Sequence, residues 1–479
     1  MKEGGFVNMV DQGPRPETES VAKAFRRRGW WPGILLVGFF LALTAGPVLS
    51  GVDRLPSKSI DMDRNHVPVI RAFAAEWPAV DVSDYDSATT PGMHLLLAMM
   101  ASLFGDSETL LQSMSVLFGG LLVGVAWWFA ARSVDGITAA LCILPLALSP
   151  YVLGNAIWVM TDDLALALVA ITVGVAVFLP PGGMTSAGSG LALVFGVLVR
   201  QINIWVCAVA WIATLLPWSK VRRHLPFRDR LDLEGRPFAA ASIFSLAILA
   251  AVGILIGFVL LWGGLVPPRF QPGGAGAAQH AGGLQTAVLP YVLTLFGIYG
   301  IAVLPGFLQV WIDDALVRRS SLLGLAIGLL AGLLLPSVPG LEYGRNGGWL
   351  WSLAASGPVV ADRSLVLILG ATLGGLVSGT FVGALIRGRR GRAALLLVGF
   401  AISFVAAYTA NVQAFQRYFD PPVLLLLGWA AALTVGSRTD AGVITRNRVV
   451  FVVGVAAFMQ AVFAIATIYL PLIRVAGSG

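Results

Sequence analysis

Residues 59–92 read SIDMDRNHVPVIRAFAAEWPAVDVSDYDSATTPG, and this stretch decides how the chain around it is interpreted. It lies between two apolar runs and gathers acidic residues that the rest of the chain mostly avoids. These acids are Asp61, Asp63, Glu76, Asp81, Asp84 and Asp86. A polar, proline-punctuated segment cannot lie in hydrocarbon, because every exposed backbone polar group would lack a partner there. We therefore expect this segment to sit in water beside a membrane and to carry the chemistry.

The composition around this stretch is typical of a polytopic membrane protein. Of 479 residues, 57% are hydrophobic and 12% are charged, and the mean hydropathy is +0.82. Soluble domains carry about 25% charged residues. The net charge of +7 would suggest nucleic acid in a soluble protein, but here the basic residues lie in short loops and indicate orientation, so we expect no nucleic-acid partner. Cys142 and Cys207 lie inside apolar runs and predict neither a disulfide framework nor a metal cluster.

The apolar runs predict an all-α membrane protein with about thirteen spans and a long first extracytoplasmic loop. We expect the spans at 30–52, 110–131, 137–151, 164–179, 189–199, 204–216, 238–262, 289–312, 322–335, 365–386, 394–410, 423–435 and 449–472. The run 91–104 is short for a crossing and predicts a re-entrant or interfacial helix. Because the positive-inside rule places the dense basic clusters in the cytoplasm, the loops with unusual polar motifs all fall on the opposite face.

This topology divides the chain into six parts. Residues 1–29 form a cytoplasmic tail that lacks a cleavable-signal pattern, so the first span (30–52) should remain as a helix. The other parts are a catalytic loop (53–109), a core membrane module (110–262), an extracytoplasmic loop (263–288) and a C-terminal membrane module (289–479). The glycine-rich segment 273–283 is either a lid that orders on substrate or simple slack.

Asp61 and Asp63 follow the first span closely. A carboxylate near the membrane surface can take a proton from a sugar hydroxyl as a general base. The alternative is an ordinary solvated acidic loop. His66 lies three residues past Asp63 and could face the same site if the segment is helical.

Asp162 and Asp163 begin an expected span. Thr161 is a plausible N-cap, and acids complement the dipole of a helix N-terminus, so capping alone would explain the pair. The alternative is a second carboxylate that orients substrate or binds a cation.

Two arginine motifs lie at the outer ends of expected spans. Arg200-Gln201-Ile202-Asn203 stands between two apolar half-runs, where such residues are costly and indicate function, unless they merely form the tip of a helix hairpin. Gln416-Arg417-Tyr418-Phe419 repeats the theme, although interfacial belts are rich in tyrosine anyway. Arginine is suited to bidentate phosphate recognition, so the shared face suggests one anionic ligand. Arg345 adds another cation on this face.

Several motifs are absent from the sequence. It contains no GxxxxGK[ST] phosphate loop, no HExxH and no GxSxG nucleophile elbow, and it has no cytoplasmic nucleotide-sugar domain. A phosphate-linked donor would therefore have to arrive through the membrane as a lipid.

The order of these parts resembles a GT-C glycosyltransferase, the polytopic class that uses polyprenyl-phosphate sugars. Within it, the chain is most similar to the dolichyl-phosphate-glucose alpha-1,2-glucosyltransferase family. The segments that carry the resemblance are Met62-Asp63 with His66 and Pro68 (the family's MDE…H.P, with Arg64 in place of Glu), Thr89-Thr90-Pro91-Gly92-Met93-His94 (TT.PG.Y), Arg200-Gln201-Ile202-Asn203-Ile204-Trp205 (RQTNI.W), Gly263-Gly264 with His280 and Leu289-Pro290-Tyr291 (a GG…H…PQ.FY loop that lacks the family's Asp-Lys), and Phe415–Phe419 (FRYF).

The resemblance implies an inverting transfer from a beta-linked lipid-phosphate donor, with an acid of the first loop as base and with no metal or other cofactor. It assigns the base to Asp63, with Asp61 as the alternative. The donor-binding residues would be Arg200, Gln201, Asn203, Arg417 and Tyr418. The residues that bind the acceptor or support the site would be His66, Asp162, Asp163, His280 and Arg345.

The expected partners are a polyprenyl-phosphate-linked sugar, a glycan or glycolipid acceptor and membrane lipids. The Ala-, Gly- and Arg-rich composition with short loops favours a bacterial plasma membrane, with the active site outside. The sugar would be a hexose, with glucose first and mannose or a pentose as alternatives. A lipid or solute transporter is the alternative from another class, but it would need charges along the middle of several spans.

Overall fold

The computed structural model describes residues 29–55, 58–180, 182–216, 237–274, 283–337, 346–411, 413–436 and 446–477. These residues are mostly helical, which confirms the all-α class. The strands found in them are two residues long and form two pairs. β1 (Asn346–Gly347) runs parallel to β4 (Ala414–Phe415), and β2 (Val359–Val360) runs antiparallel to β3 (Arg363–Ser364).

Nine helical runs of the described residues are long and apolar enough to cross a membrane. They are α2 (Trp31–Ser50), α5 (Glu108–Ala130), α8 (Thr161–Phe178), α12 (Pro237–Trp262), α16 (Ala315–Leu334), α18 (Leu365–Arg387), α19 (Gly391–Thr409), α20 (Gln416–Val435) and the run of α21 (Arg446–Ala464), η7 (Ile465–Tyr469) and α22 (Leu470–Gly477). A tenth results if the bent pair α6 (Gly136–Ala147) and α7 (Pro150–Ile157) is one span.

Shorter apolar helices account for the remaining expected runs. α9 (Gly183–Val199), α10 (Val206–Leu215) and α14 (Val288–Gly300) coincide with three of the expected spans. α4 (Gly92–Phe104) has 13 residues, as expected for the short run after the acidic stretch. Every apolar run identified in the sequence therefore falls on a helix of the described residues, and the fold is that of a polytopic membrane protein.

Two expected spans are interrupted, which corrects their prediction as continuous helices. α6 ends at Ala147, and α7 starts at Pro150 with a bend of 71°. Proline ends the hydrogen-bond ladder because it has no backbone N–H, and the Ser149 hydroxyl instead caps α7 by accepting from the Tyr151 N–H at 3.3 Å. The run 289–312 likewise breaks after α14 into η5 (Ile301–Val303) and α15 (Leu304–Asp313).

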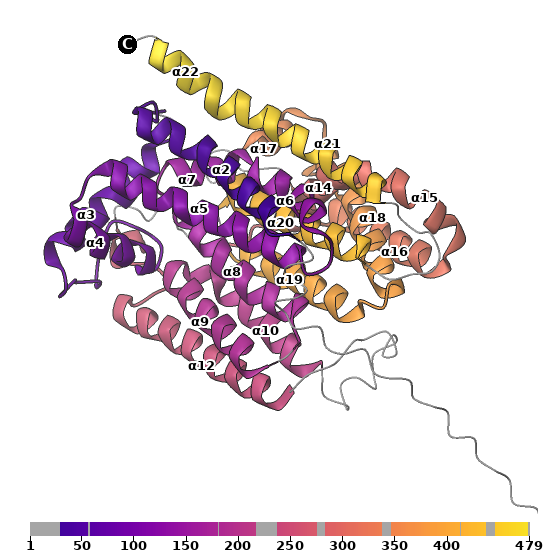
Figure 1. Ribbon diagram of the computed structural model, residues 1–479, viewed down its shortest axis with the longest axis horizontal. Coiled ribbons are helices and arrows are strands. Elements are labelled where there is room, and N and C mark those ends of the chain that lie inside the picture. Colours follow the sequence, from indigo (N-terminus) through magenta and orange to yellow (C-terminus); the bar gives the residue numbers. More distant parts are fainter. Residues whose placement is uncertain are drawn as a thin grey trace, which may run out of the picture.

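The acidic stretch is more ordered than a solvated loop. It contains the π-helical turn η1 (Met62–His66) and the helix α3 (Val67–Glu76), whose second residue is Pro68. α3 packs against α4, and the two lie together at one end of the molecule, at the left of Figure 1. The same view shows α12 along the lower edge and α21 with α22 along the upper edge.

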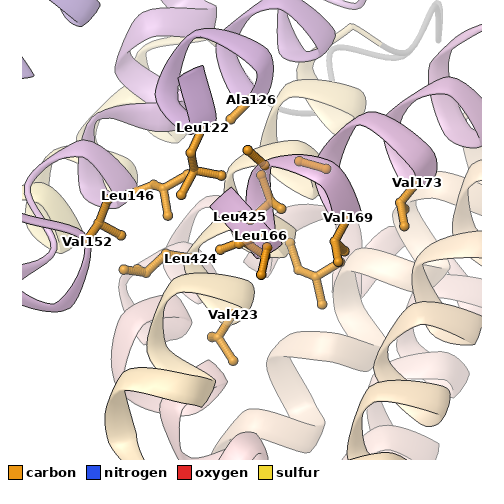
Figure 2. Packing of buried hydrophobic residues seen from close by; sticks show 14 of the residues in the cluster. Leu122, Ala126, Leu146, Val152, Leu166, Val169, Val173, Val423, Leu424 and Leu425 are labelled. Carbon is orange, nitrogen blue, oxygen red and sulfur yellow. The ribbon is translucent and has the colours of Figure 1, made fainter. Parts of the chain in front are cut away.

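The core lies where α5, α6, α7, α8 and α20 meet, and Figure 2 shows part of it. The labelled side chains are Leu122 and Ala126 of α5, Leu146 of α6, Val152 of α7, Leu166, Val169 and Val173 of α8, and Val423, Leu424 and Leu425 of α20. Of the nine membrane-length runs, α20 is the most buried inside the protein, with 89% of its apolar window covered. The N-terminal turns of α8 and α20 are therefore held in fixed positions, and both carry charged residues.

Close helix packing depends on glycine in the C-terminal part. α16 packs along α18, and a Cβ on Gly324 would overlap the carbonyl oxygen of Gly375, with the converse also true. Small residues let membrane helices approach backbone to backbone, where dispersion and weak polar contacts replace the missing hydrophobic effect.

Basic side chains join the loops at the end of the bundle away from α3 and α4. Arg390 donates to the Ser133 hydroxyl at 3.3 Å and to the Gly436 carbonyl at 2.9 Å. Arg392 donates to the Leu179 carbonyl at 3.2 Å. These contacts gather the C-terminal ends of α5, α8, α18 and α20 at one end, which leaves the N-terminal ends of α8 and α20 at the other.

Candidate active site

Two arginines from distant parts of the chain converge on one tyrosine. Arg200 follows the last turn of α9, and Arg417 and Tyr418 lie in the first turn of α20. The guanidinium carbons lie 4.7 Å (Arg200) and 5.2 Å (Arg417) from the centre of the Tyr418 ring. Arg417 also lies 5.1 Å from the Phe415 ring. Both cations thus lie against one aromatic ring, a favourable cation–π arrangement.

Each arginine is paired with a carboxylate. Arg200 forms an ion pair with Asp162, in the first turn of α8, and both side chains are only a little over one-tenth exposed. Arg417 Nη1 lies 2.8 Å from Asp61 Oδ2, directly before η1. Arg417 stands at the positive end of the α20 dipole, where a cation destabilises a helix. Helix stability therefore does not explain the presence of Arg417.

His66 lies among these four charged groups and is buried against a second histidine. His66 Nδ1 and His94 Nε2 are 3.0 Å apart, so one proton is shared across that contact. His94 Nδ1 is buried and makes no hydrogen bond to any described residue. Burial lowers the pKa of His66 to about 4, with Asp61 and Asp162 opposing the shift and Arg417 and Arg200 supporting it. Burial also lowers the pKa of His94 well below its usual value, so both rings are neutral at pH 7.

Asp63 lies in a different, more exposed network. Its carboxylate forms an ion pair with Arg54 and accepts from the Ser59 hydroxyl at 2.9 Å. Arg54 also pairs with Glu108 at the start of α5. The structure therefore brings Asp61, and not Asp63, into contact with the arginine pair.

A small cavity lies beneath the arginines. It holds about 30 Å³, the space of about two water molecules, and Asn155, Asp163, Trp205 and Tyr408 contribute to its lining with the charged residues. The Asn155 amide donates to Asp163 Oδ1 at 3.3 Å. Three atoms of the lining, Asp163 Oδ2, Trp205 Nε1 and Arg417 Nε, are buried and make no hydrogen bond to any described residue. Such atoms normally mark a place for water or a ligand.

Gln201 and Asn203 hold the backbone of the site together. The Gln201 amide donates to the carbonyls of Ala88 at 2.7 Å and Leu265 at 3.1 Å, and its oxygen accepts from the Thr90 N–H at 3.0 Å. The Asn203 amide donates to the Gly196 carbonyl at 3.1 Å. Gln201 therefore fixes the Arg200 turn against the acidic stretch. Asn203 ties the same turn back to α9.

One further expectation is corrected, and others concern residues that the structure does not describe. Thr161 does not cap α8, because the N-cap position is Met160, and Thr161 is the first helical residue. His280, Arg345 and most of the glycine-rich segment lie outside the described residues. Sequence reasoning missed Tyr408 and Asn155; the only signal for Tyr408 was an aromatic hydroxyl at the outer end of an expected span. Within the described ranges, no three His, Cys, Asp or Glu residues are grouped so that they could hold a metal ion.

This chain is similar to known proteins in its structure but matches none of them by sequence. No protein family and no curated protein matches its sequence. The apo oligosaccharyltransferase of Archaeoglobus fulgidus matches with a TM-score of 0.50 and 13% identity, over 92% of this chain and 56% of that one. The Archaeoglobus fulgidus oligosaccharyltransferase AglB in complex with an inhibitory peptide and a dolichol-phosphate gives 0.44, with 11% identity over 91% and 56%. ArnT from Cupriavidus metallidurans bound to undecaprenyl phosphate gives 0.35, with 14% identity over 89% and 77%.

The first of these similarities shows a common fold. This chain spans little more than half the length of that oligosaccharyltransferase.

Proposed function

We propose that the chain is an inverting membrane glycosyltransferase that moves a sugar from a polyprenyl-phosphate donor to a hydroxyl of a glycan or glycolipid acceptor. The observation that carries the proposal is the pair of guanidiniums, Arg200 and Arg417, on the single ring of Tyr418. The two positive charges repel each other, and the two carboxylates that now balance them can be replaced by one anion that contacts both arginines. A phosphate with several oxygens suits two guanidiniums best.

The buried Nε of Arg417 supports an anion at this place. That N–H has no hydrogen-bond partner among the described residues, while the Nη atoms already contact Asp61 and the Tyr418 hydroxyl. The first turn of α20 adds the positive end of its dipole and its backbone N–H groups, which favour phosphate. The resemblance of the RQINIW and FQRYF segments to the glucosyltransferase family points to the same two arginines.

Donor binding and base activation are coupled in this proposal. The cavity beneath the arginines is too small for a sugar phosphate, so the donor must open the two ion pairs as it enters. The phosphate then takes the place of the carboxylates on Arg200 and Arg417. Asp61 is released from its ion pair next to the donor, where it can accept a proton.

The reaction then needs one displacement. Asp61 removes the proton of the acceptor hydroxyl, the hydroxyl oxygen attacks the anomeric carbon, and the bond from that carbon to the phosphate oxygen breaks. The electron pair leaves on the polyprenyl phosphate, whose new negative charge faces both arginines. Preorganised cations opposite developing charge are the largest expected electrostatic contribution. Asp63 remains the alternative base, because a rearranged first loop would bring it to the same face.

The neutral histidines support this division of roles. His66 lies among Asp61, Asp162, Arg200 and Arg417 but adds no charge to them at pH 7. With His94 behind it, the ring has its Nδ1 occupied, so its Nε2 is the position left for a contact in the site. We assign His66 to orientation of the acceptor hydroxyl or of Asp61.

The specific substrates follow only from the sequence resemblance. Glucose is the first choice of sugar, with mannose or a pentose as alternatives, and the acceptor would be a lipid-linked or cell-envelope glycan. The common fold with an oligosaccharyltransferase supports glycosyl transfer as the reaction class. The bundle end with the arginine pair would face the outside of a bacterial plasma membrane.

The test is release of polyprenyl phosphate by the purified protein. Polyprenyl-phosphate-glucose, -mannose and -arabinose are incubated separately with a membrane-glycan extract. We expect release from one donor and a loss of about 10²–10⁴-fold in Asp61→Asn, the usual contribution of a general base. Asp84→Asn, a change of an exposed acid of the same stretch that lies beside Arg269, is the control and should keep full activity.

The outcomes are distinct. Loss of activity in Asp63→Asn with activity kept in Asp61→Asn would move the base to Asp63 and leave the reaction class intact. Release from mannose or arabinose alone would change the sugar. No release from any donor, with an extract that a control enzyme shows to be active, would contradict the proposed function.

A further inference from the structure

A second charged residue of α20 is buried away from the arginine pair. Asp420 is fully buried. It accepts hydrogen bonds from the Tyr299 hydroxyl at 2.5 Å, from the Gln416 amide at 3.3 Å and from the Ser149 hydroxyl at 3.3 Å. None of the ion pairs of the described residues includes it. An ionisable group inside a membrane bundle is costly and calls for a functional explanation.

The hydrogen bonds to Asp420 offset part of the cost of holding an ionised carboxylate inside the bundle. All three hydrogen bonds place a donor against its oxygens, and bonds donated to a carboxylate stabilise its charged form. Ser149 is also the N-cap of α7, so the positive end of that helix lies near the carboxylate. The three hydrogen-bond donors are neutral, and the end of α7 supplies only a partial positive charge. Most of the negative charge of the Asp420 carboxylate is therefore not balanced inside the bundle.

Two further side chains near Asp420 have polar atoms without partners. The oxygen of the Gln460 amide and the hydroxyl of Tyr291 are buried and make no hydrogen bond to any described residue. Gln460 and Tyr291 are fully buried. Gln460 lies beside the Tyr299 hydroxyl, and Tyr291 lies within electrostatic reach of Asp420. Unpartnered oxygens around a buried carboxylate indicate a missing occupant.

Two interrupted helices end at the same place. α6 stops at Ala147, directly before Ser149, and Tyr299 lies in the last turn of α14. The C-terminal end of a helix carries the negative end of its dipole. Broken membrane helices whose C-terminal ends and buried carboxylates face one point are a recurrent way of binding small cations in a bilayer.

We infer that Asp420 is the centre of a binding site for a small monovalent cation, Na⁺ or K⁺, inside the bundle. The ligands would be the carboxylate, the Gln460 amide oxygen and the Tyr291 and Ser149 hydroxyls. These are the oxygen ligands that hard cations prefer. One carboxylate among neutral oxygens balances one positive charge, which favours an alkali cation over a divalent ion. The bound cation would neutralise the charge of Asp420, one turn after Arg417 in α20. This proposal does not depend on the proposed glycosyl transfer.

Direct binding of ²²Na⁺ and of ⁸⁶Rb⁺, as a substitute for K⁺, tests the site in the purified full chain. We expect one of the two to saturate at one cation per chain. Asp420→Asn should remove saturable binding, and Tyr291→Phe should weaken the affinity several-fold while it keeps the ring stacked on Trp351. Asp314→Asn is the control, because Asp314 already has a cation, Arg387 at 2.8 Å, and its loss should leave binding unchanged.

The site is refuted if the wild type binds neither cation saturably, or if binding survives unchanged in Asp420→Asn. Should Asp420→Asn fail to fold, Tyr291→Phe decides the question, because unchanged affinity in that variant also excludes the site. Glycosyl transfer is not measured in this experiment, so its result stands apart from the test of the proposed function.

Discussion

The buried histidine pair makes stability depend on pH in a defined direction. Burial lowers the pKa of His66 to about 4, whereas an unfolded chain keeps histidine near 6.5. Between these values the unfolded state binds a proton that the folded state excludes, so stability falls as the pH falls. The loss begins near pH 6.5 and is complete below about pH 4. His94, whose pKa is also lowered by burial, adds to the effect in the same direction.

The size of the effect follows from the two pKa values. At pH 5 an unfolded histidine of pKa about 6.5 is almost fully protonated and His66 is mostly neutral, which costs the folded state about 2 kcal/mol relative to pH 7.5. With an unfolding entropy of roughly 2 cal/mol/K per residue, this corresponds to a fall in Tm of about 2 °C. The charged groups that face His66 are Asp61 before η1, Asp162 of α8, Arg200 after α9 and Arg417 of α20.

The assay is thermal unfolding followed by tryptophan fluorescence in detergent at pH 7.5 and pH 5. The wild type is compared with the double variant His66→Gln/His94→Gln, in which neither position titrates. Carboxylates contribute equally to both proteins, so the difference between the two pH responses isolates the histidines. His66 alone accounts for about 2 °C and His94 adds to it, so we expect the double variant to lose at least about 2 °C less than the wild type between the two pH values. Equal losses in both proteins would refute the burial of neutral histidines at the site.

Three further predictions rest on single contacts. Gln201→Leu removes two donated hydrogen bonds and leaves the buried Thr90 N–H without an acceptor, so it should lower stability by roughly 2–4 kcal/mol, seen as a lower Tm. Gly375→Leu places a side chain against Gly324 and should separate α16 from α18, which would lower Tm far more than a substitution on the lipid-facing surface. Arg417→Lys keeps the charge but loses a planar fork whose two Nη atoms make separate contacts, so donor-phosphate affinity, measured by equilibrium binding, should fall about tenfold.

Apolar length and charge position were enough to predict the helices. Each expected run has a helix, because hydrocarbon leaves the backbone no other way to pair its polar groups. The breaks between α6 and α7 and after α14 could not be read from hydropathy, because the residues on both sides of each break are equally apolar. Pro150 was a visible signal for the first break, but a proline within an apolar run kinks some membrane helices without ending them.

The arginine pair was predicted for a reason that the structure illustrates. Arg200 and Arg417 were both placed at the outer ends of expected spans, and two ends on one face of a bundle can meet. Which side-chain amides join distant backbone segments by hydrogen bonds could not be predicted in the same way. Gln201 holds Ala88 and Thr90, more than 100 residues away, and no local pattern encodes a partner at that separation.

The position of the carboxylate beside the arginines depends on one π-helical turn. An α-helical reading of residues 61–66 places His66 on the face of Asp63, three residues earlier. In η1, however, the Val67 N–H donates to the carbonyl of Met62, five residues back, so one turn holds an extra residue. Asp61, five residues before His66, then lies one turn above it.

In agreement with this geometry, Asp61 is one of the charged groups that influence the pKa of His66. Because of this single wide turn, Asp61 pairs with Arg417 of the arginine pair, whereas Asp63 pairs with Arg54 in the exposed network. Wide turns of this kind are frequent at functional sites, and this one leaves Asp61 in contact with Arg417, which supports Asp61 as the proposed base.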